Sequence, residues 1–283
     1  MNNPLFSVLI ANYNNGIYIE DAIQSIFDQT YNNWEIIIVD DFSTDSSSDA
    51  YESYQKNEKI KVFRNAENKG CGYTKRRCVD EASGVICGFL DPDDILSKDA
   101  LAEMIAAHEQ NPDCSLIHSK LYFCDEKLEI LGEYSAAKNV PFGEKMFFNM
   151  HGEFTAFASF KKSFYDKTDG IDSYLIRAVD QDLYYKLYET GKTFFLDKFL
   201  YYYRVHNSGI STLSNSDKAY YWKWFTILSA AKRRGINIED FFLENFVTRY
   251  EYEMLKNKYE KVKKYSKLND FLRNIKHKFG LIK

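Results

Sequence analysis

The sequence predicts an α/β fold in which a mostly parallel sheet is flanked by helices. Over the first hundred residues, short apolar runs rich in β-branched residues alternate with amphipathic stretches. This alternation is typical of parallel strands that are connected by helices. Three of the apolar runs end in polar clusters, and ligands of such sheets bind at the carboxyl ends of the strands. From about Ser216 the pattern becomes helical, which predicts a helical C-terminal extension.

Each element of the first 110 residues has its own signal. The short, mostly apolar runs SVLIA and WEIIIV indicate buried strands, and the Ser/Thr/Asp loop after the second of them is able to cap a helix. Four apolar residues between positions 22 and 27 recur at helical spacing. The expected strands are Ser7–Ala11, Trp34–Val39, Ile60–Phe63 and Val85–Leu90, and the expected helices are Tyr18–Gln29, Gly72–Ala82 and Lys98–Gln110.

The middle of the chain, about 111–212, is irregular and rich in strand signals. Within it, Asp180–Glu189 indicates a short helix, and Thr193–Leu196 and Leu200–Val205 indicate strands. No repeat or low-complexity linker separates the parts. We therefore expect residues 1–110 and 111–212 to be two halves of one domain, followed by a helical extension over 213–283.

Composition excludes several classes of protein. With 283 residues, 45% hydrophobic and 28% charged, the chain has ample material for a core. No apolar run approaches the roughly 20 residues that span a bilayer, and the N-terminus has no pattern of a secretion signal. The five cysteines form no C-x-x-C pair, so we expect small buried hydrophobes in a reducing cytoplasm instead of disulfides or a zinc site.

The near-neutral total charge conceals an asymmetry. The formal net charge is −4, yet the stretch from Lys256 to Lys283 contains ten basic and two acidic residues, which leaves the preceding part strongly acidic. Apolar residues recur at helical spacing in this tail, namely Leu268, Phe271, Leu272, Ile275, Phe279 and Ile282. Two interpretations stay open: an interfacial helix over 267–283 that binds anionic lipid, or a terminal helix packed on the body with a solvated basic face.

The acidic residues that follow the predicted strands indicate that a phosphate-containing ligand is bound through a metal ion and not by a glycine-rich loop. Neither G-x-G-x-x-G nor G-x-x-x-x-G-K-[ST] occurs in the chain. Asp91 and Asp93 follow the fourth predicted strand, and Mg²⁺ or Mn²⁺ is commonly held by one or two carboxylates together with substrate phosphates. A bare D-x-D is common in solvated turns, but its place after a strand strengthens the metal interpretation.

The chain resembles the inverting glycosyltransferases of family 2, which have the GT-A fold. The resembling stretches follow the family's order and spacing over about the first 210 residues. They are SVLIANYNN (7–15), WEIIIVDDFSTDSS (34–47), ENKGCGYTKRRCVDEASG (67–84), FLDPDDIL (89–96) and VDQDLYYKLYETGK (179–192).

The resemblance implies a nucleotide-binding role for five positions. Ala11 ends the first expected strand, Tyr13 in the following loop matches the position that stacks on the nucleotide base, and Asp41 matches the carboxylate that accepts from uracil N3–H. Asp91 matches the ribose-contacting position. Lys75 stands where the family usually has an Arg facing the diphosphate, which keeps the charge but loses the planar fork.

The resemblance also implies the reacting groups. Asp93 matches the carboxylate that binds the divalent metal, Mn²⁺ or Mg²⁺, and His206 lies where relatives place residues near the metal or phosphates, as does Arg204. Asp180 matches the catalytic base, although the family more often has Glu-Asp where this chain has Val179-Asp180. The expected reaction is direct displacement of the nucleoside diphosphate from a donor sugar by a hydroxyl group of a glycan or lipid-linked acceptor. No nucleic acid is expected as a partner, because the body is acidic and no recognition motif occurs.

Simpler roles compete with these assignments. Asp180 also suits a helix N-terminus, and Asp182 is its rival as the base. Asp94 is expected to support the metal loop and Asp40 to be structural. The other histidines, His108, His118, His151 and His277, are expected to be structural, and Glu153 is a possible acceptor contact. A nucleotidyltransferase on a similar fold and a non-catalytic nucleotide- or glycan-binding module remain the alternative functions.

Overall fold

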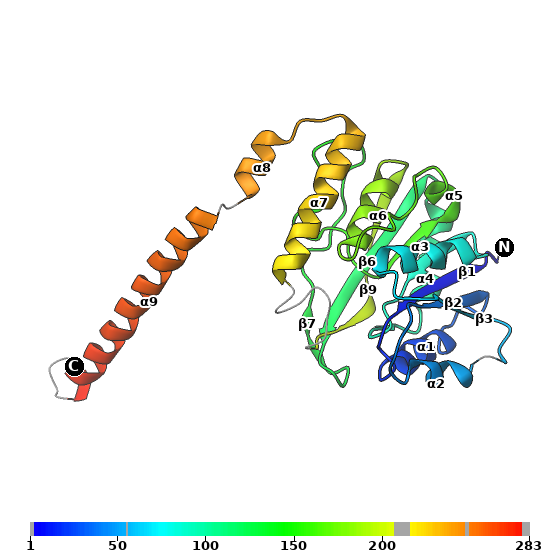
Figure 1. Ribbon diagram of the computed structural model, residues 1–283, viewed down its shortest axis with the longest axis horizontal. Helices are drawn as coiled ribbons and strands as arrows, with labels where there is room; N and C mark the ends of the chain where they lie inside the picture. The colour runs from blue at the N-terminus through cyan, green and yellow to red at the C-terminus, as the bar shows by residue number, and fades with distance from the viewer. Residues whose placement is uncertain (1–2, 55, 207–215, 247–248, 279–283) are drawn as a thin grey trace. The chain divides into compact units, whose positions relative to one another are not determined.

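The computed structural model describes residues 3–54, 56–206, 216–246 and 249–278, and it contains two compact units. The first unit, Met1–Gly235, is the α/β body, and the second, Ile236–Lys283, is helical. Each unit is described by itself. The nine strands belong to one sheet of the first unit, in the order β3-β2-β1-β4-β8-β6-β9-β5, with β7 paired to β6 (Figure 1).

The N-terminal part of the sheet is parallel, as the sequence predicts. β2 pairs with β1 and β3, and β4 pairs with the other edge of β1, all in parallel. Every residue of β2 is buried, which explains why apolar residues follow one another in Ile36–Val39 instead of alternating with polar ones. The bounds are Phe6–Asn12 for β1, Trp34–Asp40 for β2, Ile60–Arg64 for β3 and Ile86–Phe89 for β4.

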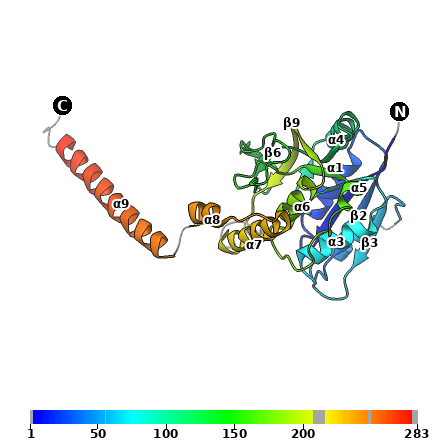
Figure 2. The ribbon, with the colours of Figure 1, turned by 90° about the horizontal axis from the view of Figure 1, so that it is seen from above.

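Successive residues of the central strands pack on opposite faces of the sheet. Ile36 and Ile38 belong to a cluster with α1 and α4, whereas Ile37 and Val39 belong to a second cluster with α3 and α6. Figures 1 and 2 show α1 and α3 on opposite sides of the sheet. The helices of this part are α1 (Ile19–Phe27), α2 (Ser47–Glu52), α3 (Cys71–Glu81) and α4 (Ala100–Gln110).

The second half of the sheet is more regular than the sequence indicates. β8 is antiparallel to both β4 and β6, and β6 runs parallel to β9, so one continuous sheet links the two halves. The strands of this half are β5 (Ile95–Leu96), β6 (Cys114–Cys124), β7 (Ile130–Glu133), β8 (Ala158–Lys161) and β9 (Lys192–Arg204), and the helices are α5 (Lys162–Tyr165) and α6 (Val179–Tyr188).

The prediction of two strands over residues 193–205 is wrong in one respect, because β9 is continuous. Ser119 of β6 pairs with Leu196, but the next residue of β6 pairs with Phe199. The intervening Asp197 and Lys198 form a bulge, and both are exposed. Two charged residues within an apolar pattern therefore mark an irregularity in one strand here, not a loop between two.

The C-terminal part is helical, as predicted from Ser216 onward. Helix α7 (Ser216–Arg234) belongs to the first unit and packs on α6, where the Arg233 Nε donates to Glu189 at 2.9 Å. The second unit contains α8 (Glu239–Asn245) and α9 (Arg249–Lys278). Among the described residues, no helix is both long enough and apolar enough to cross a membrane.

Candidate active site

A pocket of about 550 Å³ opens at the carboxyl ends of β1, β2 and β4. It is bounded on other sides by the N-terminal turns of α3 and α6 and by the end of β9. The structure brings together all eight residues that the sequence places in the site, and each of them lines this pocket. They are Ala11, Tyr13, Asp41, Lys75, Asp91, Asp93, Asp180 and His206.

The loop after β1 presents Tyr13, whose side chain is exposed. The loop is held by the segment that follows β2: the backbone N–H of Asn14 donates to the Ser43 hydroxyl at 2.9 Å, and that of Gly16 donates to Asp45 at 2.8 Å. Because these bonds fix the backbone directly after Tyr13, the loop that presents its ring has a defined conformation.

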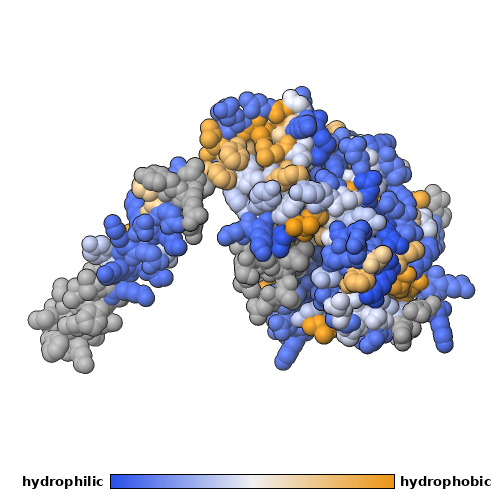
Figure 3. Space-filling model, in the orientation of Figure 1, coloured by the Kyte–Doolittle hydropathy of each residue, from blue (hydrophilic) through white to orange (hydrophobic). Residues whose placement is uncertain are grey.

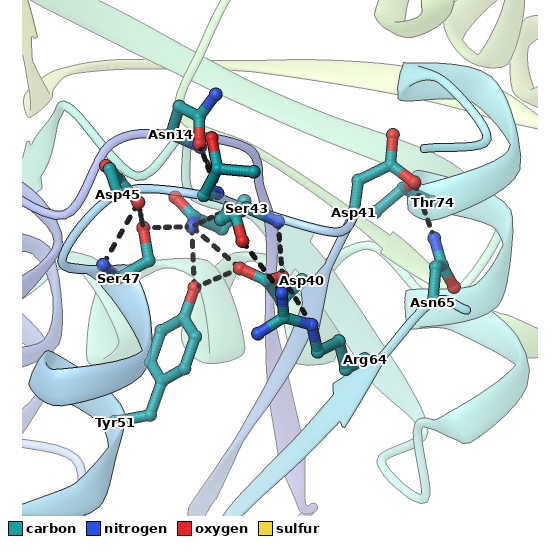
Figure 4. A network of polar contacts seen from close by, with 12 residues as sticks. Asn14, Asp40, Asp41, Ser43, Asp45, Ser47, Tyr51, Arg64, Asn65 and Thr74 are labelled. Atoms are coloured by element: carbon teal, nitrogen blue, oxygen red, sulfur yellow. Dashed lines mark hydrogen bonds and ion pairs between the residues drawn. The ribbon is translucent and has the colours of Figure 1, made fainter. Parts of the chain in front are cut away.

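Asp40 lies in a buried network beneath this loop and has the structural role expected for it. Its carboxylate accepts hydrogen bonds from the Ser43 backbone N–H at 2.8 Å and from the Tyr51 hydroxyl at 3.1 Å (Figure 4). Asn12 donates to the Tyr51 hydroxyl at 2.6 Å. Burial, together with the Asp40 charge, raises the pKa of Tyr51 far above its ordinary value, so the phenol stays neutral.

Asp41 is oriented by three donors. It is buried and accepts from the Asn65 amide at 2.7 Å and from the backbone N–H groups of Lys69 and Gly70 at 2.8 Å each. Gly70 has φ +87°, a conformation that favours glycine, and this turn directs its N–H at the carboxylate. The Asp41 side chain thus has a defined position at the edge of the pocket.

Lys75 connects two carboxylates that come from distant parts of the chain. Its Nζ lies 2.7 Å from Asp180 Oδ1 and 3.1 Å from Asp91 Oδ1. The Lys75 side chain is 5% exposed, whereas those of Asp91 and Asp180 are 41% and 43% exposed. Burial acts to lower the pKa of Lys75, but the two carboxylates outweigh burial and raise this pKa well above its usual value.

Asp93 and His206 face each other across the pocket wall. The His206 Nε2 lies 2.7 Å from Asp93 Oδ2, and the His206 ring packs on Tyr18 at a centroid distance of 5.1 Å. Burial and the Asp91 charge raise the pKa of Asp93, an effect that the contact with His206 opposes. A carboxylate and an imidazole in one wall are both donors that Mn²⁺ accepts.

Within the described ranges, no group of three or more acidic, His or Cys side chains is arranged to hold a metal. Two protein donors still fit a divalent ion whose remaining ligands are diphosphate oxygens and water, which is the usual arrangement for Mg²⁺ at phosphate sites.

Asp94 and Arg204 shape the loop that carries Asp93. Asp94 is buried and accepts from the Tyr201 hydroxyl and the Arg204 backbone N–H, both at 2.7 Å. The Arg204 guanidinium donates to the Asp93 carbonyl at 2.7 Å and to Asp21 at 2.8 Å. These contacts fit the supporting role expected for Asp94. Arg204 also lines the pocket, but much of its guanidinium is hydrogen-bonded to protein groups.

The first turn of α6 contains two aspartates with different surroundings. Asp180 lines the pocket, whereas Asp182 is buried beside Lys186 at 2.6 Å and Arg233 at 3.4 Å and does not line the pocket. The geometry therefore favours Asp180 over its rival. Val179, which stands where the family more often has Glu, is buried in the core, so an apolar side chain suits this position.

Several other candidates lie away from the pocket. His108 contacts the Ser159 hydroxyl at 2.9 Å and His118 packs between two Phe rings, and burial lowers the pKa of both to about 3. Glu153 is buried and accepts from the His151 backbone N–H at 3.2 Å. The side chain of His277 lies outside the described residues.

The cysteines are free in the described structure, and burial raises their pKa values, in Cys71 to about 12. They match the small buried hydrophobes that the sequence predicts, although Cys71 is only half-buried and lines the pocket.

Sequence analysis missed several residues that line the pocket. Arg177 precedes α6 by two residues, and Ile176 and Tyr203 add apolar surface. Asn68 and Gly70 also line the pocket, and both lie in the stretch ENKG, for which the sequence predicts no individual site residue. A basic residue just before an acidic helix start was the signal for Arg177, but position alone does not show which way its side chain points.

Comparisons with known proteins show which proteins the chain is similar to. The sequence profile described as "Glycosyl transferase family 2" matches residues 7–169. A Bacillus subtilis glycosyltransferase named for teichuronic acid biosynthesis, TuaG, is 41% identical over 103 residues, which cover 36% of this chain and 41% of that protein.

Two further relatives match over longer stretches. An uncharacterized glycosyltransferase of Methanocaldococcus jannaschii, MJ1057, is 30% identical over 240 residues, which cover 83% of this chain and 82% of that one. A Campylobacter jejuni protein named GalNAc(5)-diNAcBac-PP-undecaprenol beta-1,3-glucosyltransferase is 29% identical over 77% of this chain and 70% of its own length.

Solved structures confirm the GT-A fold. Staphylococcus aureus TarS 1–349, solved in complex with UDP-GlcNAc, has a TM-score of 0.62 at 21% identity and covers 79% of this chain and 65% of its own. The mannosyltransferase PcManGT of Pyrobaculum calidifontis, solved with GDP-Man and Mn²⁺, has a TM-score of 0.58 at 14% identity over 92% of this chain and 81% of its own.

Proposed function

The chain belongs to glycosyl transferase family 2, and from this premise we propose that it transfers a sugar from a nucleotide diphosphate donor to a hydroxyl group of a glycan or lipid-linked acceptor. The observation that carries the proposal is the pocket in which Tyr13, Asp41, Lys75, Asp93 and Asp180 meet. An aromatic ring, an oriented carboxylate, a cation, a metal-binding carboxylate and a base are the groups that such a reaction needs.

The donor is proposed to be a UDP-sugar. The Tyr13 ring would stack on the base, and the fixed Asp41 carboxylate would accept from the uracil N3–H. Asp91 would contact the ribose, and Lys75 the diphosphate. The TarS structure with UDP-GlcNAc supports this assignment, whereas PcManGT with GDP-Man makes guanine the competing base.

Asp93 and His206 would hold a divalent metal, Mn²⁺ or Mg²⁺. When bound, the ion supplies neutralisation of the charge that develops on the leaving diphosphate. The protein's own part is to hold Asp93 in place: Arg204 binds the Asp93 carbonyl, and Asp94 binds the Arg204 backbone. Both contacts fix the loop that presents the carboxylate.

Asp180 would act as the general base. It would remove the proton of the acceptor hydroxyl as this oxygen attacks the anomeric carbon from the side opposite the diphosphate, and such direct displacement inverts the anomeric centre. Its place in the first turn of α6 suits a carboxylate, and its side chain lines the pocket.

Incubating the protein with Mn²⁺, lipid-linked saccharides and a panel of UDP- and GDP-sugars tests the proposed function. We expect release of UDP that depends on both the donor sugar and the acceptor. Pyrophosphate release from nucleoside triphosphates would instead support a nucleotidyltransferase. Nucleotide binding without turnover across the panel would support a non-catalytic module, and either result would overturn the proposal.

We further propose that the basic stretch 267–283, which includes the C-terminal end of α9, associates with anionic membrane at the cytoplasmic face. In the part of α9 that precedes this stretch, Met254, Leu255, Tyr259, Val262 and Tyr265 are each more than half exposed and fall on one side by the helical period. Lysines occupy much of the remaining surface, and Figure 3 shows mostly hydrophilic side chains on the visible face of α9. The apolar residues of the predicted interfacial stretch, 268–282, have side chains outside the described residues.

Liposome flotation tests this proposal, with the chain ending at Tyr265 as the comparison. We expect the full chain to float with vesicles that contain anionic lipid and to lose this binding in neutral vesicles, because each Lys or Arg near an anionic surface contributes about 1 kcal/mol. The shortened chain is expected to stay mostly unbound. Equal flotation of the two chains, or binding that does not depend on anionic lipid, would refute the membrane role of 267–283.

A further inference from the structure

The ion pairs of Lys75 use two groups that the proposed reaction needs in other places. Lys75 Nζ lies 2.7 Å from Asp180, the proposed base, and 3.1 Å from Asp91, the proposed ribose contact. The pairs join α3, the loop after β4 and α6, three elements that are far apart in sequence. The cation is nearly buried, while both carboxylates are partly open to the pocket.

This arrangement limits what Lys75 and Asp180 can do at the same time. An ammonium group has three N–H donors, and two of them are directed at Asp91 and Asp180. The Phe89 ring, with its centroid 4.9 Å from Nζ, covers another side of the cation. A diphosphate that binds Lys75 closely therefore competes with Asp91 and Asp180 for the Lys75 ammonium.

The pair also affects the base. While Lys75 is bound to it, the Asp180 Oδ1 accepts from the ammonium at 2.7 Å and is not available to the proton of an acceptor hydroxyl. The other titratable groups that face Asp180 do not offset this charge: burial raises the pKa of Cys71 on α3, Tyr184 on α6 and Tyr203 on β9, which keeps all three neutral. Asp91 shares the same lysine, and Arg177 also lines the pocket.

We propose that Lys75 is a positioning residue that couples donor binding to release of the base: the diphosphate of the donor draws the Lys75 ammonium away from Asp180, and the carboxylate becomes free to accept the acceptor proton. This inference rests on the proposed function. It implies that the base is held by Lys75 in the donor-free protein and that the donor binds before the acceptor is deprotonated.

A double-mutant cycle in nucleotide affinity tests the coupling without relying on turnover. Affinity for UDP is measured by titration calorimetry in the unaltered chain, Asp180→Asn, Lys75→Met and the double variant. If the donor must break the Lys75–Asp180 pair, Asp180→Asn removes that cost, and we expect UDP to bind about threefold to tenfold more tightly. In the Lys75→Met background no pair exists, so Asp180→Asn is expected to change the affinity by no more than about twofold.

The sign of the coupling separates this mechanism from simple repulsion. Loss of the Asp180 charge reduces its repulsion of the diphosphate in both backgrounds, whereas release of Lys75 adds a gain only where Lys75 is present. An equal or larger gain in the Lys75→Met background would overturn the proposal, because Lys75 would then bridge the base and the diphosphate together.

Two controls keep the test specific. Lys192→Met removes an exposed cation that pairs with Asp113 and does not line the pocket, and we expect it to leave the effect of Asp180→Asn intact. Thermal unfolding of each variant checks that the fold is retained. Failure of the unaltered chain to bind UDP or any other nucleoside diphosphate would refute the proposed function itself, a result distinct from binding without coupling.

Discussion

Replacing Asp180 by Asn is expected to lower the rate of sugar transfer by about 10²–10⁴-fold, the usual contribution of a general base. The amide keeps the size of the side chain but cannot take a proton from the acceptor hydroxyl. Asp180 lines the pocket with 43% of its side chain exposed, so the change removes no core packing. Steady-state rates of nucleoside diphosphate release, measured with saturating donor and acceptor, check this prediction.

Asp182→Asn is the matched control, since it alters the same chemical group two residues along the same helix. Asp182 is buried beside Lys186 and Arg233, so its loss leaves cations without their partner, and we expect a lower melting temperature. The rate per folded molecule should stay within about threefold of the unaltered enzyme, because no reacting atom is touched. If Asp182→Asn abolishes turnover of folded protein while Asp180→Asn does not, the base assignment is wrong.

Replacing Asp93 by Ala is expected to lower the transfer rate by at least about 100-fold and to abolish the dependence of UDP binding on Mn²⁺. Metal stabilisation of a leaving group contributes several kcal/mol, and His206 alone would retain the ion poorly. Calorimetric titrations of UDP with Mn²⁺ and with a chelator measure the second effect independently of turnover.

Asp94→Asn provides the comparison for this experiment. Burial and the charges of Asp93 and Asp91 raise the pKa of Asp94 well above its usual value, so a neutral amide of the same shape is a close substitute. The amide oxygen can accept from the Arg204 backbone, and the Tyr201 hydroxyl can reorient. Metal-dependent UDP binding should therefore persist in this variant. Its persistence in Asp93→Ala as well would show that Asp93 is not a ligand.

The parallel half of the fold could be predicted from sequence because its strands are buried on both faces. WEIIIV at 34–39 and SVLIA at 7–11 are mostly apolar runs in which Glu35 and Ser7 are the exceptions, and the strands β2 and β1 extend them by only one or two residues. β6 could not be predicted in this way, since Ser115, His118 and Ser119 interrupt its pattern although all three are buried. Their burial depends on β8 and β9, which lie far away in sequence.

The residues of the site were predictable and their contacts were not. Asp41, Asp91 and Asp93 could be predicted as residues of one binding site because each follows a predicted strand and matches a position of the family. Nothing in the local sequence shows that Lys75 lies 2.7 Å from Asp180, because 105 residues separate them and only the packing of α3 near α6 brings them together. The difference between Asp180 and Asp182 likewise depends on Arg233, which arrives from α7.

The three donors around Asp41 have a thermodynamic consequence. Asn65, Lys69 and Gly70 already hold the carboxylate in the ligand-free protein, so a nucleobase that enters this corner does not have to immobilise it. On binding as proposed, mainly the nucleotide would lose conformational entropy, because the Asp41 side chain is already fixed. This favours affinity for the base of the donor. The same rigidity makes the corner selective, since a base with a different edge meets an acceptor that cannot turn to suit it.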